Sequence, residues 1–197
     1  MKSVIQSACS VVALACLSLV GGCYNTKDAV FSSRHGIHVS ALAGEYRCIE
    51  IMGSDEAGTY KRHALTVTRI EEIPNETYSY KFVWLEDRHF FDNEFAAAMH
   101  RVTDDRFIAF GRDRNAFLAI PVHVAGSMLT FYMPGQNTKK NGVLALLAKT
   151  MRVELAAHGA DTLQVTLKGD VYDQRKFLEK AAASDDNVVL ARCTRKV

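Results

Sequence analysis

Residues 86–100 carry the side chains best suited to metal chemistry. Imidazole and carboxylate groups are ligands for zinc and similar divalent ions, and six such side chains occur in this stretch. Their spacing matches no known metal motif, and a polar loop between strands has this composition by default, with local ion pairs. We therefore expect a solvated loop, with a metal or hydrolase site as the less favoured alternative. The six residues are Glu86, Asp87, His89, Asp92, Glu94 and His100.

A row of aromatic residues at alternate positions is the second candidate site. Tyr78, Tyr80, Phe82 and Trp84 share one face of a predicted strand, because successive side chains of a strand point to opposite faces. Such a row can line a ligand pocket, since aromatic rings bury a large apolar area while Tyr and Trp keep a polar group. An ordinary core face has the same pattern and is the interpretation we favour.

Patterns typical of catalysis are missing from the sequence. Gly126-Ser127-Met128 lacks the second glycine of a Gly-x-Ser-x-Gly nucleophile turn, and Gly-x-Gly-x-x-Gly, phosphate-loop and His-Glu-x-x-His patterns do not occur. His123 shares an apolar run with Pro121, which indicates an edge strand and a partly exposed imidazole. We assign no catalytic residue, metal or cofactor, and expect no enzymatic activity.

The amino-terminal stretch, residues 1–22, is predicted to be a secretory signal peptide. Lys2 supplies the positive charge, residues 11–20 form the densest apolar run, and Gly21-Gly22 is a small-residue exit. An uncleaved membrane helix is the alternative. It needs about 20 apolar residues, and polar residues near the start shorten the available run.

The run Leu19-Val20-Gly21-Gly22-Cys23 resembles the lipobox of bacterial lipoproteins, in which an aliphatic residue and two small residues precede the cysteine. The resemblance implies that a diacylglyceryl group is attached to the Cys23 sulfur, that the chain is cleaved before Cys23, and that the new amine is acylated. Two or three acyl chains anchor a protein stably in a membrane. Tyr24, rather than Asp, follows the cysteine, which by the family's sorting rule implies the periplasmic face of the outer membrane.

Cleavage and lipidation would leave two cysteines of the mature chain unmodified. Of the five cysteines, Cys9 and Cys16 would leave with the signal peptide and Cys23 would be acylated, so Cys48 and Cys193 remain. In an oxidising compartment we expect these two to form a disulfide that ties the start of the folded domain to its end. Two separate buried thiols are the alternative.

The charge balance argues against nucleic acid as a partner. Removing Lys2 with the signal peptide leaves 23 Lys and Arg residues against 22 Asp and Glu, a net charge of +1. Nucleic-acid-binding domains carry basic patches. The expected partners are the membrane, through the lipid on Cys23, and a protein of the cell envelope.

Short strands dominate the rest of the chain, because apolar and polar residues alternate in segments separated by turn residues. Residues 95–99 would also suit a helix, since three consecutive alanines favour one. Three- and four-residue apolar steps predict a helix over 143–157 that covers the sheet, and Asp170 is placed to cap a second helix over 171–183. The expected strands are residues 46–51, 64–70, 78–85, 95–102, 106–111, 116–124, 127–133, 162–167 and 188–193.

These elements predict a mainly β or α+β fold, an antiparallel meander, barrel or sandwich of about seven to nine strands with one or two C-terminal helices packed on it. Gly44-Glu45-Tyr46 resembles the Gly-x-aromatic start of lipocalin-type barrels, which implies the barrel form. We expect three regions. They are the signal peptide at 1–22, the lipidated cysteine and a tether at 23–43, and a single β-rich globular domain at 44–197.

The expected function follows from the anchor and from the missing catalytic patterns. It is a membrane-anchored lipoprotein whose periplasm-facing domain serves as an accessory or interaction module of the envelope. The alternative is a binding module that holds a small apolar ligand or lipid in a barrel cavity.

Overall fold

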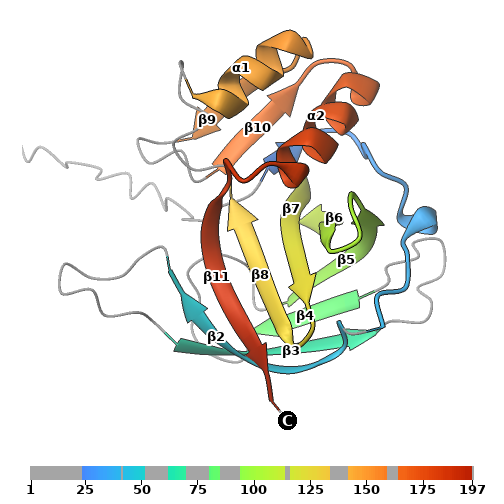
Figure 1. The fold of residues 1–197 in the computed structure, drawn as a ribbon. Helices are drawn as coiled ribbons and strands as arrows, with labels where there is room; N and C mark the ends of the chain where they lie inside the picture. The colour runs from blue at the N-terminus through green and yellow to red at the C-terminus, as the bar shows by residue number, and fades with distance from the viewer. Residues whose placement is uncertain are drawn as a thin grey trace, which may run out of the picture.

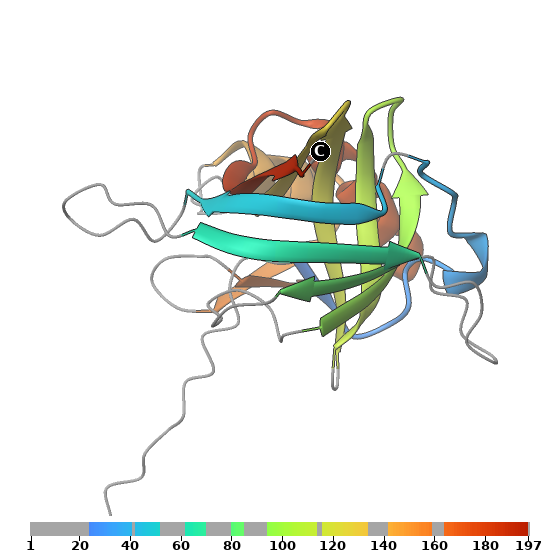
Figure 2. The same cartoon turned by 90° about the horizontal axis from the view of Figure 1, so that it is seen from below.

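Eight antiparallel strands close into a barrel in the computed structural model of this chain (Figures 1 and 2). The structure describes residues 24–40, 42–51, 62–69, 80–84, 94–113, 116–133, 142–158 and 164–196. The barrel strands are β2 (Gly44–Glu50), β3 (Arg62–Arg69), β4 (Tyr80–Trp84), β5 (Glu94–Arg101), β6 (Arg106–Asp113), β7 (Ala116–Ala125), β8 (Met128–Met133) and β11 (Val188–Arg195). Strands β2 to β8 each pair with the next in the chain, and β11 lies between β8 and β2, which closes the circle. The predicted fold class is confirmed, in its barrel form.

Three further strands extend the sheet outward from β7. The strand next to β7 pairs with it antiparallel and with its other neighbour in parallel, and the third strand lies at the edge. These strands are β1 (Tyr24–Thr26), β10 (Gln164–Lys168) and β9 (Glu154–His158), in that spatial order. The helices are η1 (Ser33–His35), a short 3-10 helix, α1 (Val143–Thr150) and α2 (Val171–Ala183).

Helix α2 packs on the outer wall of the barrel. As predicted, Asp170 caps it, with its side chain accepting a hydrogen bond of 2.8 Å from the Tyr172 amide. Buried Phe177 shares an outer core with Ile108 and Phe110 of β6, whose alternate residues point into the barrel instead. Figure 1 shows α1 and α2 together beside β10. Neither of these two described helices is long and apolar enough to cross a membrane.

Strand β7 is a central strand, which corrects the edge strand expected from Pro121. One side of β7 pairs with β1 as far as Ala119, and with β8 from Val122 onward. Pro121 lies between these two pairings. Because proline has no backbone N–H to donate, a central strand tolerates it best where one neighbour ends and the next begins.

The segment predicted as a tether belongs to the folded domain. Tyr24 and Thr26 are buried within the sheet, and Val30, Phe31 and Leu42 are buried farther along the segment. A strand of three residues is too short for its alternation to be recognised, and it is stabilised by distant residues of β7 and β10. The description of residues 23–43 as a tether was therefore wrong from Tyr24 onward.

The predicted helix over 143–157 was too long, because α1 ends at Thr150 and β9 starts at Glu154. Arg152 adopts a left-handed backbone conformation with a φ of 58°, which a helix cannot continue. Leu155 fits the helical spacing and the strand equally well. Residues 95–99, which suited either type of element, lie in strand β5.

Candidate functional site in the barrel interior

The aromatic row faces the interior of the barrel. Tyr80 and Phe82 are buried there, and the half-buried Trp84 packs against the same core. The ring of Phe131 from β8 lies 6.0 Å from that of Phe82 and 5.6 Å from that of Trp84, measured between centroids. Tyr78 lies outside the described residues.

Side chains fill the barrel around this row. A cavity wide enough for a ligand would expose the side chains that line it, yet Phe82, Met99 and Phe131 are only 1%, 0% and 2% exposed. Met99 comes from β5 and Phe131 from β8, so rings and aliphatic chains from separate strands meet in the centre. The described part of the interior is a packed core.

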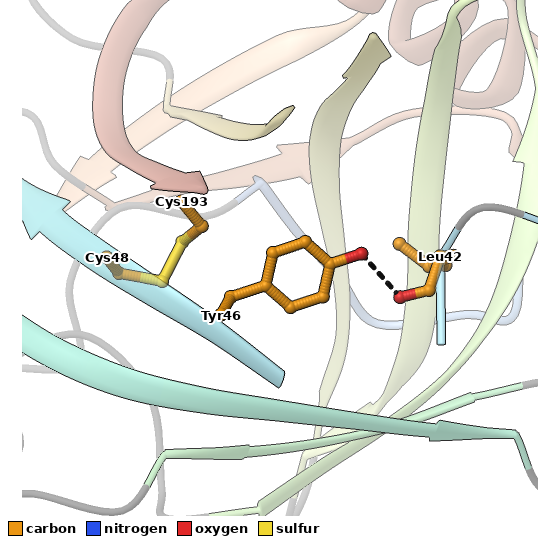
Figure 3. The surroundings of a disulfide bond; sticks show 4 residues. All are labelled: Leu42, Tyr46, Cys48 and Cys193. Atoms are coloured by element: carbon orange, nitrogen blue, oxygen red, sulfur yellow. Dashed lines mark hydrogen bonds between the residues drawn. A yellow bond between two sulfur atoms is a disulfide. The ribbon is translucent and has the colours of Figure 1, made fainter. Parts of the chain in front are cut away.

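A disulfide joins the strands that close the barrel. Cys48 of β2 and Cys193 of β11 lie directly opposite one another, and their sulfur atoms are bonded across a sequence separation of 145 residues (Figure 3). Both side chains are buried in the interior core. The predicted disulfide is present in the structure.

The residues before β2 close one end of the barrel. This end segment consists of residues 37–40, 42 and 43, and its buried Val39 and Leu42 belong to the interior core. Tyr80 donates a hydrogen bond of 2.9 Å to the Val39 carbonyl and accepts one of 2.6 Å from the Val39 amide. Tyr46 donates one of 2.8 Å to the Leu42 carbonyl (Figure 3). Burial raises the pKa of Tyr46, with Arg195 acting in the opposite direction, which keeps the phenol protonated as a donor.

Arg195, near the end of β11, completes this closure. Its guanidinium donates to the carbonyl of Ala43. A Cβ atom at Gly44 would lie 2.7 Å from the Arg195 Nε, and Gly44 has a φ of 156°. A glycine is therefore needed at the start of β2, where the arginine side chain lies against the backbone.

Of the six candidate metal ligands in residues 86–100, the structure describes two, Glu94 and His100. Glu94 forms an ion pair of 2.6 Å with Lys81 on the neighbouring strand, whereas His100 lies farther along β5 on the outer wall. Within the described ranges, no three His, Cys, Asp or Glu side chains come close enough together to hold a metal ion. Glu86, Asp87, His89 and Asp92 lie outside the described residues.

An aromatic and basic cluster on the outer wall is absent from the sequence predictions. The imidazole of His100 stacks on the ring of Phe31 with centroids 4.6 Å apart, and the Arg175 guanidinium carbon lies 5.4 Å from the centroid of the same Phe31 ring. Burial, followed by Arg175 and His35, lowers the pKa of His100 to about 4. The His100 Nε2 atom is buried and has no hydrogen-bond partner among the described residues. These residues come from three distant segments, so no local spacing could have indicated the cluster.

His123 has a partner at the end of β7. Its Nε2 atom lies 2.9 Å from the Oδ2 atom of Asp105. A hydrogen bond from Thr103, followed by that from His123, lowers the pKa of the Asp105 carboxyl group. The partly exposed imidazole expected from the sequence is present, in contact with a carboxylate oxygen of Asp105.

Comparisons of this chain with protein-family models, curated proteins and solved structures found no match. Cys23 lies outside the described residues. The structure thus provides a closed β-barrel, an architecture that proteins use as a binding module.

Proposed function

We propose that this chain is a membrane-anchored bacterial lipoprotein whose barrel is an interaction module of the cell envelope, using its outer surface to bind a protein partner. The packed interior is the observation that carries this proposal. Small barrels bind either within a central cavity or on their outer surface and loops. Since Phe82, Met99 and Phe131 are buried together in the interior core, the outer surface is the better candidate.

The disulfide supports export of the domain. Disulfides persist in the periplasm and other oxidising compartments and are rare in a reducing cytosol. A bond between Cys48 and Cys193 is therefore consistent with the signal peptide and lipobox-like sequence before Cys23. Outer-membrane location and the periplasmic orientation are part of the same proposal.

Mass spectrometry of the mature protein tests the anchor. We expect a chain beginning at Cys23, with added acyl mass on that residue and no alkylatable thiol at Cys48 or Cys193. In a Cys23→Ser variant the acyl mass should disappear while the disulfide remains. An unmodified Cys23 in the wild-type protein would refute the lipoprotein assignment.

Crosslinking in intact cells, followed by capture of the protein, tests the interaction module. We expect one envelope protein to be recovered above background, in a stable ratio to the barrel. The matched control attaches the same signal peptide and cysteine to an unrelated barrel, which should not recover that partner. Recovery of no partner across several growth conditions would contradict the proposal.

Native mass spectrometry separates the outer-surface proposal from the ligand-carrier alternative. If the interior is filled, the mature protein should show no noncovalent ligand. A lipid or other apolar molecule bound at one copy per chain would instead favour the alternative, and would require interior side chains such as Phe82 to move.

A further inference from the structure

We propose that the acyl anchor on Cys23 holds the barrel directly against the membrane surface, without a flexible tether, at the point where β1 begins. This inference rests on the proposed lipidation of Cys23. Its structural basis is Tyr24, the residue immediately after the lipidated position.

Tyr24 is fixed in the fold on all sides. Its side chain is 0% exposed, its ring meets that of Phe177 edge-on at 5.7 Å, and its hydroxyl donates a hydrogen bond of 3.0 Å to the Oδ1 atom of Asn187. Its backbone lies between two strands, opposite Ala119 of β7 and Val165 of β10. Tyr24 therefore has no freedom to act as part of a linker.

The distance from the anchor to the folded domain follows from covalent geometry. Consecutive Cα atoms are about 3.8 Å apart, so the lipidated residue lies within one residue of a buried position. A flexible tether of about 20 residues would instead have separated the two by about 25 Å on average. The acyl chains begin at the level of the lipid head groups, so the surface beside Tyr24 must rest on the head groups.

Strands β7 and β10 lie beside β1 at this surface, since each pairs with β1 at a spacing of about 5 Å. The turn between β7 and β8, at Gly126 and Ser127, lies seven residues along β7 from Ala119, the partner of Tyr24, which is about 23 Å in a strand. Figure 1 shows β7 and β8 converging at the end of the barrel where this turn lies. A probe at the exposed Ser127 thus reports motion of the whole barrel from a position outside β1, β7 and β10.

A linker insertion tests the inference through the rotational motion of the barrel. The acylated protein carries a fluorophore on a Ser127→Cys variant and is placed in phosphatidylglycerol-phosphatidylethanolamine vesicles. With the natural junction, the time-resolved anisotropy should decay to a high plateau, because the barrel can turn only with the membrane. Insertion of about ten Gly and Ser residues between Cys23 and Tyr24 should remove most of that plateau.

The matched control places the same linker between Asp28 and Ala29, in the exposed turn after β1. There β1 stays between β7 and β10, so the plateau should remain high. A low plateau for the natural junction, or equal loss of the plateau with both insertions, would overturn the inference. Thermal melts of both variants confirm that each folds.

Failure of the underlying proposal gives a different result. If Cys23 is not acylated, the wild-type protein lacks acyl mass and does not float with the vesicles, whatever the state of the junction. If it is acylated and floats but rotates freely, the lipid anchor stands and the direct attachment of the barrel is refuted.

Discussion

At the scale of single residues, the buried His100 is expected to make the stability of the outer wall depend on pH. Burial keeps its pKa near 4 in the folded protein, against an ordinary value of 6.5. The unfolded chain therefore takes up a proton at a higher pH than the folded one. The unfolding free energy therefore keeps its full value above about pH 6.5 and decreases as the pH falls from 6.5 toward 4.

A His100→Phe variant tests this pH dependence. Phenylalanine keeps a ring against Phe31 and removes the titratable group. Between neutral pH and about pH 4 the wild-type protein should lose about 3 kcal/mol more unfolding free energy than the variant, since each pKa unit corresponds to about 1.4 kcal/mol. Urea denaturation at both pH values measures the difference. Equal losses in the two proteins would show that His100 is not the responsible group.

Gly44 is the second residue whose identity the structure explains. A Gly44→Ala change would place a Cβ atom 2.7 Å from Arg195 at a φ of 156°. We expect a loss of about 1–3 kcal/mol in unfolding free energy, together with displacement of the guanidinium from Ala43.

Gly126→Ala is the matched control for this prediction. Gly126 also has a positive φ, of 58°, but a Cβ atom there meets nothing within 4 Å. Its cost should be limited to about 1 kcal/mol for the left-handed backbone. Chemical denaturation of both variants provides the comparison, and a larger loss at Gly126 than at Gly44 would contradict the proposed closure by Arg195.

At the scale of elements, alternation in the sequence was sufficient to locate most barrel strands. Strands such as β4 bury one face in the core, so Tyr80, Phe82 and Trp84 recur at every second position. Strand β1 was not predicted, because three residues carry too little periodicity. Strand β9 was not predicted, because Leu155 continues an apolar pattern at helical spacing. The pairing of β1 also depends on residues far away in the sequence, in β7 and β10.

The disulfide is the element-scale feature with the largest predicted effect. It joins β2 to β11, the first and last strands of the barrel, and encloses most of the chain. A Cys48→Ala, Cys193→Ala double variant should lose up to about 5 kcal/mol of unfolding free energy, because the unfolded chain gains conformational freedom. Denaturant titration of the oxidised wild type and the double variant measures this loss. Equal transition midpoints would show that strand pairing alone closes the barrel.

At the scale of the whole molecule, the sequence could not distinguish a barrel with a ligand-binding cavity from a barrel with a packed interior. The spacing of the aromatic row predicted that its side chains share one face of a strand. The ring of Phe82 lies beside that of Phe95, its cross-strand partner on β5, and meets that of Phe131 from β8, a strand that does not pair with β4. The sequence pattern of one strand contains no information about a neighbour as distant as Phe131.

A Phe82→Ala variant tests whether the interior is a core. In a packed barrel, removal of this ring leaves a void beside Phe95 and Phe131 and should cost about 3–5 kcal/mol in unfolding free energy. In a container, the ring would line existing space, so its removal would cost less and would enlarge a cavity that already binds a ligand. Denaturant titration measures the first effect, and uptake of a small apolar fluorophore measures the second. A small loss of stability combined with tighter uptake would therefore indicate a carrier, whereas a large loss would show that the interior is a packed core, as the outer-surface proposal requires.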